Sequence, residues 1–447
     1  MIYTAANPRC ENLIVGLGET GLSVARHLAA QGVSFAVTDT REAPAGLVRL
    51  ARIPGADRAW AGPLSQIDPG RWQRVIVSPG ISKALPILER AVASGAELIG
   101  DIELFARNVR GPVIGITGSN GKSTVTALVG ELLRSLGKQV AVGGNFGTPA
   151  LDLLESGADL YVLELSSFQL ETTCSLRTAS AAILNISADH LDRYPDMQAY
   201  IAAKARILTG AERVVLDRDD PSLMALAEAG HAVTFGLGPP PRPIDFGITD
   251  HDGESWLTQG SRPILATREL GLQGRHNWLN ALSALALTWP WIDSPEKVTA
   301  TLRGFVGLPH RSQLVARVNG VDYIDDSKGT NVGAALASIR GVAGDLILIA
   351  GGQGKGQDFT PLADALVGKA RGVVLLGVDA QLIARALHDS VPVRRVDSIE
   401  DAVSCAAAWA RPGDTVLLSP ACASLDMFAS YAERGERFAA AVRGLAS

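Results

Sequence analysis

The sequence predicts an α/β protein made of three consecutive units, each built around a mainly parallel sheet. Short β-branched and aliphatic runs alternate with helical patterns along most of the chain, which is typical of parallel α/β folds. The length of 447 residues allows about three domains. We place the units at residues 1–105, 106–306 and 307–447.

The first unit alternates strand and helix patterns. Strands are predicted at Leu13–Val15, Ser34–Thr38 and Arg74–Ser78, and a helix at Gly21–Ala30. A strand–helix–strand order indicates a parallel sheet.

The second unit starts near Gly111 and contains the clearest helix of the chain. A β-branched strand, Val113–Thr117, leads to a helix that begins after Lys122. Apolar residues recur there at positions 125, 128, 129, 132, 133 and 136, which is the spacing of an amphipathic helix, and Gly137 ends it. Further expectations are strands at Leu160–Leu163, Ala181–Leu184 and Arg213–Leu216, a proline-rich loop from Gly236, and a hairpin around Ile248–Leu257.

The third unit starts near Leu308. Its predicted strands are Val321–Ile324, Leu346–Ala350, Gly372–Leu376 and Thr415–Leu418, with helical segments between them. This pattern again indicates a doubly wound α/β sheet.

Composition excludes several classes of protein. Hydrophobic residues make up 47% and charged residues 19% of the chain, which excludes a largely disordered protein. The formal net charge of −5 gives no overall attraction to nucleic acid or to an anionic membrane. Four scattered cysteines form no CxxC pair, the N-terminus does not have the pattern of a signal peptide, and no apolar run reaches the ~18 residues of a membrane span. We therefore expect a soluble cytoplasmic enzyme.

A glycine-rich turn follows the first predicted strand. Gly16, Gly18 and Gly21 open the first helix, and Asp39 lies at the end of the next strand. Glycines at such a turn let the backbone approach a pyrophosphate at the helix N-terminus. The pattern favours a nucleotide diphosphate, not specifically NAD, and a tight turn without a ligand is the alternative.

A second glycine-rich loop precedes the central helix. Residues 115–124 read GITGSNGKST. Backbone N–H groups in such a loop bind phosphates, with Lys122 as a point charge and Ser123 as a hydroxyl ligand for Mg²⁺. Ile116 stands where a strict P-loop has its first glycine. The strand–loop–helix context still predicts ATP or GTP binding.

Two further polar residues follow predicted strands, where the ligand crevice of such sheets lies. Glu164 is predicted to hold the metal that bridges nucleotide phosphates, the alternative being a helix cap. His190 lies in the run NISADHLD, which favours a metal ligand over a structural histidine. Lys204 lies between alanines in a helical pattern, and from this context alone it is expected to extend into solvent.

Taken together, the motifs resemble those of the Mur ligase family. The runs that carry the resemblance occur in this order: GITGSNGKST, LELSSFQLE, DHLDRYP, GRHNWLNAL, GLPHRSQ, DDSKGTN, GGQGKG and LLSPACASLD. The runs DIELF, LELSSFQLE and SPACASLDMF are similar to those of the members that add D-glutamate. The resemblance covers nearly the whole chain, from Gly16 to beyond Asp426.

The resemblance implies a Rossmann-like first domain for a UDP sugar, a central P-loop-type ATPase domain, and a Rossmann-like third domain for the amino acid. It implies ATP-dependent addition of D-glutamate to UDP-N-acetylmuramoyl-L-alanine through an acyl phosphate, in peptidoglycan precursor synthesis. Two Mg²⁺ ions and a monomer are expected from the family. Phosphoryl transfer between anions needs cations, and the acyl phosphate must be kept from water, which domain closure provides.

The family motifs also assign site residues by position. Catalytic roles are implied for Lys122, Glu164, His190 and Lys204, and metal binding for Ser123, Glu164, His190 and Lys204 as a carbamate. A carbamate needs a neutral amine, and hence a lowered lysine pKa. ATP binding is implied for Gly118, Ser119, Asn120, Gly121, Lys122, Ser123, Thr124, Asn277, Asn280, Arg311 and Asp326. UDP-sugar binding is implied for Gly18, Glu19, Thr20, Asp39, Thr40, Arg41, Gly80, Asn145 and His190. D-Glutamate binding is implied for Lys328, Thr330, Lys355, Ser424, Leu425 and Tyr431.

Two residues depart from the family pattern. Glu19 places an acid beside the expected diphosphate, so its side chain should point away, and Tyr431 stands where phenylalanine is common. Two alternatives to the D-glutamate ligase remain. One is another ligase of the superfamily, such as a folylpolyglutamate synthase or an enzyme that adds a different amino acid, including L-glutamate. The other is a dinucleotide-dependent oxidoreductase, which leaves the run at 115–124 unexplained.

Overall fold

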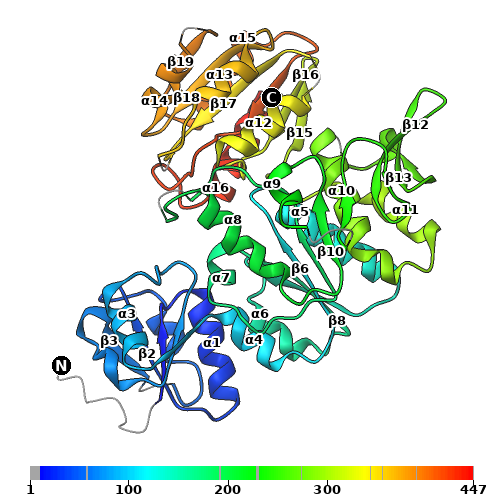
Figure 1. Ribbon diagram of the computed structural model, residues 1–447. Coiled ribbons are helices and arrows are strands. Elements are labelled where there is room, and N and C mark those ends of the chain that lie inside the picture. The colour runs from blue at the N-terminus through cyan, green and yellow to red at the C-terminus, as the bar shows by residue number, and fades with distance from the viewer. Residues whose placement is uncertain are drawn as a thin grey trace.

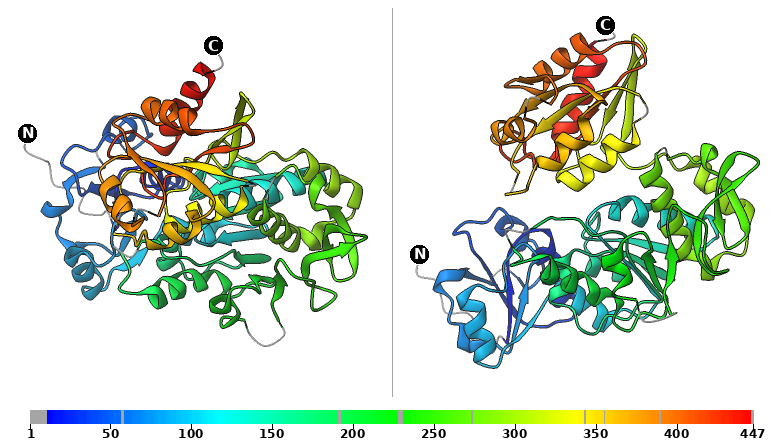
Figure 2. Two further views of the ribbon diagram at one scale, coloured as in Figure 1. Left: turned by 90° about the horizontal axis from the view of Figure 1, so that it is seen from above. Right: turned by 45° about the horizontal axis from the view of Figure 1, so that its top comes forward.

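The structure is a computed structural model that describes residues 11–56, 59–190, 193–227, 231–272, 274–342, 344–354, 356–388 and 390–445. Three α/β units follow one another along the chain, from the blue first unit through the cyan and green central unit to the orange and red third unit (Figure 1). Figure 2 shows the same three units from two further directions. The predicted fold class is confirmed.

The first unit contains a five-stranded parallel sheet in the order β3-β2-β1-β4-β5. Its strands are β1 (Asn12–Val15), β2 (Phe35–Asp39), β3 (Trp60–Pro63), β4 (Arg74–Val77) and β5 (Glu97–Ile99). Its helices are α1 (Glu19–Ala30), α2 (Leu47–Leu50), α3 (Pro86–Ala93) and α4 (Asp101–Asn108), with 3₁₀ turns at Leu64–Gln66 and Pro69–Arg71. The three predicted strands and the predicted helix are present. The sequence analysis missed β3 and β5, because β3 contains Gly62 and Pro63 and β5 is very short.

The central unit contains a six-stranded parallel sheet in the order β11-β10-β9-β6-β8-β7. Its strands are β6 (Val113–Thr117), β7 (Val140–Gly144), β8 (Leu160–Glu164), β9 (Ser180–Ile183), β10 (Val214–Asp217) and β11 (Val233–Phe235). Its helices are α5 (Lys122–Ser135), α6 (Ala150–Leu153), α7 (Ser167–Glu171), α8 (Met197–Ala205), α9 (Pro221–Met224), α10 (Arg275–Thr288) and α11 (Pro295–Gly304). Further 3₁₀ turns lie at Leu154–Ser156, Arg206–Leu208, Thr267–Glu269 and Trp289–Trp291. The predicted hairpin is present as β12 (Phe246–His251) and β13 (Glu254–Gln259), which pair with β14 (Arg262–Ala266) in a small antiparallel sheet.

The third unit contains a six-stranded sheet in the order β15-β16-β20-β17-β18-β19. Its strands are β15 (Gln313–Val318), β16 (Val321–Asp325), β17 (Leu346–Gly351), β18 (Ala370–Leu376), β19 (Val393–Arg395) and β20 (Thr415–Leu418). Only β15 runs antiparallel to its neighbour. Its helices are α12 (Val332–Gly341), α13 (Thr360–Leu366), α14 (Ala380–Ala386), α15 (Ile399–Trp409) and α16 (Tyr431–Gly444). All four predicted strands are present.

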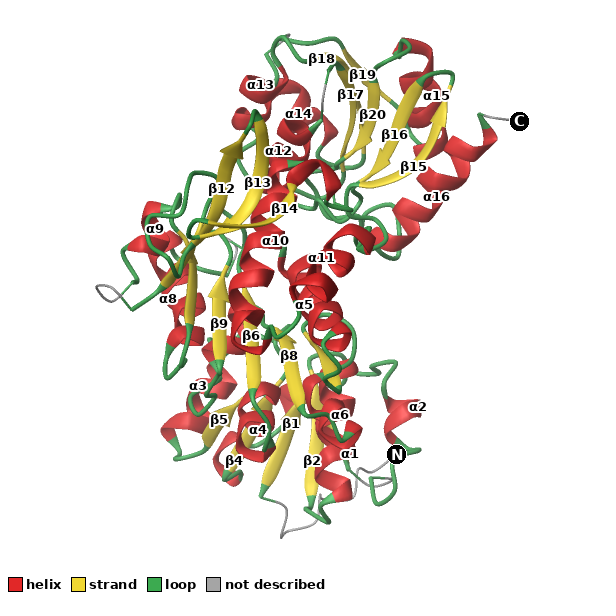
Figure 3. Ribbon diagram, turned by 90° about the vertical axis from the view of Figure 1, so that its right-hand side faces the viewer, coloured by secondary structure: helices red, strands yellow, loops and turns green. Residues whose placement is uncertain are grey.

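The apolar core is divided unequally among the units. One buried cluster runs from the first sheet through α4 and α6 to one face of the central sheet. A second cluster fills the other face of the central sheet, where α5, α10 and α11 pack side by side (Figure 3). The third unit has two clusters of its own, one on each face of its sheet.

The central sheet determines where the polar residues meet. Its strands are parallel, so their carboxyl ends lie at one edge, where such sheets bind ligands. Glu164 at the end of β8 is in register with Gly144 of β7 and Ile116 of β6. Within the described ranges, no helix has the length and apolar character that a bilayer span requires.

Candidate active site

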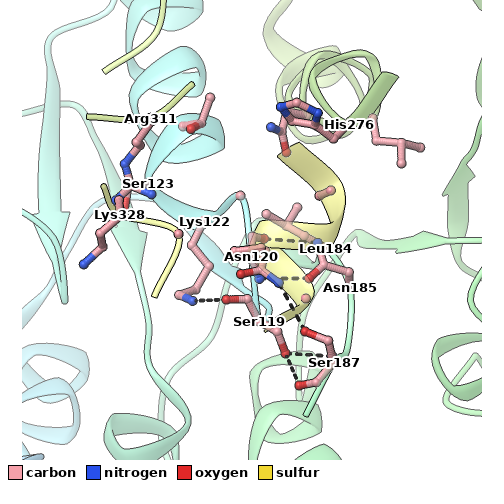
Figure 4. Close-up of a pocket in the computed structure, with 18 of the residues that line it drawn as sticks. Ser119, Asn120, Lys122, Ser123, Leu184, Asn185, Ser187, His276, Arg311 and Lys328 are labelled. Atoms are coloured by element: carbon pink, nitrogen blue, oxygen red, sulfur yellow. Dashed lines mark hydrogen bonds between the residues drawn. The ribbon is translucent and has the colours of Figure 1, made fainter. Parts of the chain in front are cut away.

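A cavity of about 530 Å³ lies at the carboxyl edge of the central sheet and extends to the third unit (Figure 4). It brings together residues from the loop before α5, the end of β8, the loop after β9, the first turns of α10, and the loops around β16. The predicted site residues on its wall are Ser119, Asn120, Gly121, Lys122, Ser123, Thr124, Asn145, Glu164, His190, Asn277, Asn280, Arg311, Asp326, Lys328 and Thr330.

The loop before α5 is shaped by two glycines in the left-handed region. Gly118 has φ 149° and Gly121 has φ 80°. A Cβ atom on Gly121 would lie 2.5 Å from Oδ1 of Asn280, so the loop approaches α10 more closely than a side chain allows. The backbone N–H of Ser119 donates to the main-chain oxygen of Asn185 over 2.9 Å. The backbone N–H of Asn120 donates to the side-chain Oδ1 of the same residue, also over 2.9 Å. The loop is therefore tied to the segment that follows β9.

Lys122 occupies the first turn of α5 with its ammonium group turned back over this loop. Its Nζ donates to the carbonyl oxygens of Gly118 and Ser119, both over 2.9 Å (Figure 4 shows the bond to Ser119). Burial lowers the pKa of Lys122, and the charges of Glu164 and Asp189 oppose that shift. The lysine is thus a half-buried cation at the N-terminus of a helix, where phosphate binds readily.

Glu164 is the centre of a network at the end of β8. Ser123 Oγ donates to its Oε2, and Asn145 Nδ2 donates to its Oε1 over 2.7 Å. The guanidinium of Arg311 reaches the same place and donates to Ser123 Oγ over 2.6 Å. The helix-cap alternative for Glu164 is wrong, because Ser166 caps α7 in a capping box.

His190 follows β9 in a strained backbone conformation, with φ 58°. Its N–H donates to Asp189 Oδ1 over 2.9 Å, and its ring lies edge-on to Phe168 with the ring centroids 4.8 Å apart. The histidine thus lies on the cavity wall with its backbone held by the preceding aspartate.

Lys204 does not extend into solvent as its sequence context predicted. Its side chain is only 2% exposed, and its Nζ donates to the Gly118 carbonyl oxygen over 2.8 Å and lies 4.6 Å from the centre of the Tyr200 ring. Burial lowers the pKa of Lys204 well below its usual value, and the charge of Lys122 adds to this shift. The expectation failed because α8 packs against α7 and against the loop before α5. The alanines on either side of Lys204 in the sequence give no sign of this packing.

Asn277 and Asn280 lie on one face of α10, and Asn280 Nδ2 donates to Asn277 Oδ1 over 3.0 Å.

Asp326 faces the cavity from the third unit and accepts from the hydroxyls of Ser338 and Ser419, over 2.7 and 2.8 Å. Burial raises the pKa of Asp326 to about 6, although these hydrogen bonds act in the opposite direction.

The residues expected to contact the amino acid are only partly brought together. Lys328 and Thr330 line the cavity, and Lys328 Nζ lies 4.1 Å from the centre of the Tyr431 ring. Ser424 is buried and Leu425 is 69% exposed, and neither lines the cavity, nor does Tyr431. Lys355 lies outside the described residues.

The expected UDP-sugar residues of the first unit form a separate group. Gly18, Glu19, Thr20, Asp39, Thr40, Arg41 and Gly80 do not line the cavity. Asp39 accepts hydrogen bonds from the backbone N–H of Leu17 and from Arg41. Burial by itself would raise the pKa of Asp39, but these bonds lower it to about 2. The Glu19 carboxylate accepts a hydrogen bond from Arg49 Nη2 over 2.9 Å.

Arg434 is a buried residue that the sequence analysis missed. It is 1% exposed and donates to the carbonyl oxygens of Ser327 and Cys422 over 2.8 and 3.2 Å. It therefore joins the loop after β16 to the loop after β20. An arginine within the amphipathic pattern of α16 resembles a surface residue, so no sequence signal identified it.

Among the described residues, no group of three or more histidine, cysteine, aspartate or glutamate side chains is placed to hold a metal ion. Ser123 Oγ and the Glu164 carboxylate contact each other on this wall, and the amide nitrogen of Asn145 donates to the same carboxylate.

Comparison with known proteins identifies the family. Three family profiles match successive parts of the chain: a MurD-like Mur ligase N-terminal domain at residues 10–100, a Mur ligase middle domain at 116–288, and a Mur ligase glutamate ligase domain at 310–422. The chain is 51% identical over 439 residues to UDP-N-acetylmuramoylalanine–D-glutamate ligase of Pseudomonas putida, covering 97% of each chain. It is 48% identical to the enzyme of the same name from Nitrosococcus oceani, covering 98% of this chain and 97% of that one.

Solved structures agree at the level of the fold. A UDP-N-acetylmuramate–alanine ligase from Thermotoga maritima superposes with a TM-score of 0.61 at 19% identity, covering 97% of this chain and 99% of that one. A pseudomurein peptide ligase from Methanothermus fervidus gives the same TM-score and identity, covering 97% and 100%. The profiles and the full-length identity together show that this chain belongs to the Mur ligase family, within the branch of the UDP-N-acetylmuramoylalanine–D-glutamate ligases.

Proposed function

We propose that this chain joins D-glutamate to UDP-N-acetylmuramoyl-L-alanine in an ATP-dependent reaction of peptidoglycan precursor synthesis. The observation that carries the proposal is the joint placement of Lys122, Ser123 and Glu164 on one cavity wall, in a chain 51% identical to a ligase of that name. The alanine carboxylate takes the γ-phosphoryl group of ATP, which gives an acyl phosphate and ADP. The amine of D-glutamate then attacks the carbonyl carbon, loses a proton, and phosphate leaves.

Binding of ATP falls to the loop before α5. On binding, the ammonium of Lys122 would exchange the carbonyl oxygens of Gly118 and Ser119 for phosphate oxygens, since an anion is the stronger partner for a cation. Arg311 reaches Ser123 from the other side of the cavity and would neutralise the transferred phosphoryl group. Asn277 and Asn280 would contact adenine from α10, and Asp326 the ribose.

The residues fit a Mg²⁺ ion. A hydroxyl and a carboxylate are hard oxygen donors of the kind that Mg²⁺ takes, and Ser123 and Glu164 already contact each other. Held there, Mg²⁺ would supply positive charge that offsets the charge of the phosphate groups. Its remaining ligands would come from water and phosphates, because the described residues contain no ready-made cluster of protein ligands.

Lys204 would act after modification. Its lowered pKa favours the neutral amine, which adds CO₂ with loss of a proton and becomes an anionic carbamate. The new carboxylate and His190 would then hold a second Mg²⁺. The carbamate would place a negative charge beside the ammonium of Lys122, which attracts it.

The two remaining substrates would enter from the outer units. The turn at Gly18–Glu19–Thr20, with Asp39, Thr40, Arg41 and Gly80, would hold the UDP part, while Asn145 and His190 would contact the sugar side of that substrate. Lys328, Thr330, Lys355, Ser424, Leu425 and Tyr431 would hold D-glutamate. A dicarboxylic amino acid needs cationic partners and backbone N–H partners for its two carboxylates. Lys328 and Lys355 would supply the cationic partners. We propose that the enzyme acts as a monomer in the cytoplasm.

Phosphate release tests the proposal. The enzyme is given ATP, Mg²⁺ and UDP-N-acetylmuramoyl-L-alanine, with D-glutamate or L-glutamate in separate reactions. Release with D-glutamate alone is expected. Release with L-glutamate alone would keep the reaction but overturn the amino-acid assignment, and release with neither would overturn the function.

A further inference from the structure

Asn331 is a buried side chain at the start of α12, 4% exposed, on the wall of the cavity. It is the N-cap of this helix, and its Oδ1 accepts from the N–H of Ala334 over 2.8 Å. Because a backbone N–H only donates, this contact determines which end of the amide is the oxygen. The amide nitrogen must therefore point away from its own helix.

That nitrogen bridges the third unit to two loops of the central unit. Nδ2 of Asn331 donates to Oδ1 of Asn120 over 3.2 Å and to Oδ2 of Asp189 over 3.1 Å. Asn120 belongs to the phosphate loop, two residues before Lys122. One side chain thus caps a helix of the third unit and contacts both polar loops of the central unit.

Both acceptors are themselves held in place. Asn120 Nδ2 donates to Ser187 Oγ over 3.1 Å (Figure 4). Asp189 uses its other oxygen, Oδ1, to accept from the N–H of His190, which has a positive φ. A carboxylate that is fixed at both oxygens fixes the strained histidine backbone as well.

Gly333 brings the helix close enough for this contact. A Cβ atom there would lie 2.7 Å from Ser187 Oγ and 3.0 Å from Ser187 Cβ, which is too close without a shift. The first turn of α12 therefore packs directly on the segment between β9 and His190.

We propose that Asn331 is a positioning residue of the ligase: its amide holds α12 against the phosphate loop and orients Asp189, and through Asp189 the backbone of His190. The inference rests on the proposed function. It assigns to Asn331 an effect on turnover through Asn120 and Asp189, without contact to a substrate.

Asn331→Asp separates the two uses of this side chain. Aspartate caps helices as well as asparagine, so α12 keeps its cap. The donor is lost, and a carboxylate then faces the carboxylate of Asp189 and Oδ1 of Asn120. We expect kcat to fall about 10- to 100-fold, the range of a lost hydrogen bond to a charged group. The KM for the UDP substrate and the melting temperature should stay near those of the parent.

The exchange variant Asn331→Asp with Asp189→Asn provides the rescue. An amide at position 189 can donate to the new carboxylate while its oxygen still accepts from the N–H of His190. The double variant should recover at least about tenfold in kcat over Asn331→Asp, which a double-mutant cycle measures as coupling. Ser398→Asn is the matched control, since it exchanges one good N-cap residue for another on α15, outside the cavity wall.

Gly333→Ala tests the close approach separately. Alanine favours a helix more than glycine does, so the helix itself should not suffer. The added methyl group should hold α12 away from Ser187 and lower kcat. Gly444→Ala is its control, because a Cβ at that position on α16 meets nothing within 4 Å.

The radius of gyration from small-angle X-ray scattering provides a readout that does not depend on activity. Asn331→Asp should enlarge it relative to the parent, and the exchange variant should reverse the change. An Asn331→Asp variant with unchanged kcat and radius, or a loss of kcat that the exchange does not restore, overturns the inference. If the parent releases no phosphate with either glutamate, the proposed function fails, while the scattering still decides whether Asn331 holds α12.

Discussion

Lys122 and Lys204 donate hydrogen bonds to the same atom, the carbonyl oxygen of Gly118, over 2.9 and 2.8 Å. Two ammonium groups that bind the same buried carbonyl oxygen repel each other as like charges. Little water reaches this oxygen, so the repulsion is weakly screened. Burial and then the charge of Lys122 lower the pKa of Lys204. Burial and the nearby charge of Lys122 therefore favour a neutral amine at Lys204, the form that reacts with CO₂.

Lys122→Ala should lower kcat at least about 100-fold, because a cation aimed at developing charge is lost. Binding of the UDP substrate should not change, since the residues proposed for the UDP part lie in the first unit. Phosphate release and calorimetric titration of the substrate measure the two effects. Lys138→Ala, at an exposed lysine just beyond α5, is the control and should behave like the parent. A variant that keeps its turnover would contradict the role of Lys122.

Lys204→Ala should be nearly inactive and should regain part of its kcat when formate or acetate is added. Such an acid can place a carboxylate in the space that the carbamate would occupy. Rates are measured against acid concentration, with the exposed Lys297→Ala as the control that needs no rescue. Absence of rescue at any concentration would leave the lysine as a buried cation and would contradict the carbamate.

Glu164→Gln should raise the Mg²⁺ concentration needed for half-maximal rate at least about tenfold. The glutamine keeps the shape and the acceptor for Asn145 but loses the negative charge. The measurement is a Mg²⁺ titration of phosphate release at saturating ATP. Glu131→Gln, on the exposed face of α5, should leave the titration unchanged. An equal shift in both variants would indicate a general charge effect.

Asp101 should make the free energy of unfolding depend on pH. Burial raises the pKa of its carboxyl from 3.8 to about 6, and its Oδ1 has no hydrogen-bond partner. The folded state thus binds the proton more tightly than the unfolded state, so its stabilisation is complete below about pH 4 and is lost as the pH rises through about 6.

Asp101→Asn should therefore gain stability relative to the parent between about pH 4 and 6, by up to about 3 kcal/mol, and the difference should stay constant at higher pH. Urea unfolding at a series of pH values measures it. Asp293→Asn, at an exposed aspartate, should show no such change. A pH-independent difference for Asp101→Asn would show that its carboxyl titrates alike in both states.

The elements with regular patterns were predictable from the sequence. The strand Val113–Thr117 occurs where its β-branched run lies, and α5 follows the spacing of its apolar residues. Among the strands that were not predicted, β3 contains Pro63 and β14 contains Pro263. Both lie at the edge of their sheet. Their structure comes from pairing with a neighbour and not from local preference.

The site was predictable where one short run carries the chemistry. Ser119 to Thr124, Glu164 and His190 meet at one edge because parallel strands bring their ends together, a rule that applies to any such sheet. The depth of Lys204, the acceptor it shares with Lys122, and the bridge from Asn331 to Asp189 depend on how α8 and α12 pack. Lys204 and Gly118 are 86 positions apart in the sequence, and Asn331 and Asp189 are 142 positions apart. Contacts over such separations produce no local sequence pattern that could predict them.

The unequal division of the apolar core has a consequence for cooperativity. The first two units share one continuous buried cluster, so neither can unfold or tilt without exposing the apolar surface of the other. The third unit keeps its own clusters, and its contacts with the central unit include the polar ones of Arg311 and Asn331. Thermal denaturation followed by calorimetry would accordingly separate into two transitions, a joint one for the first two units and an independent one for the third.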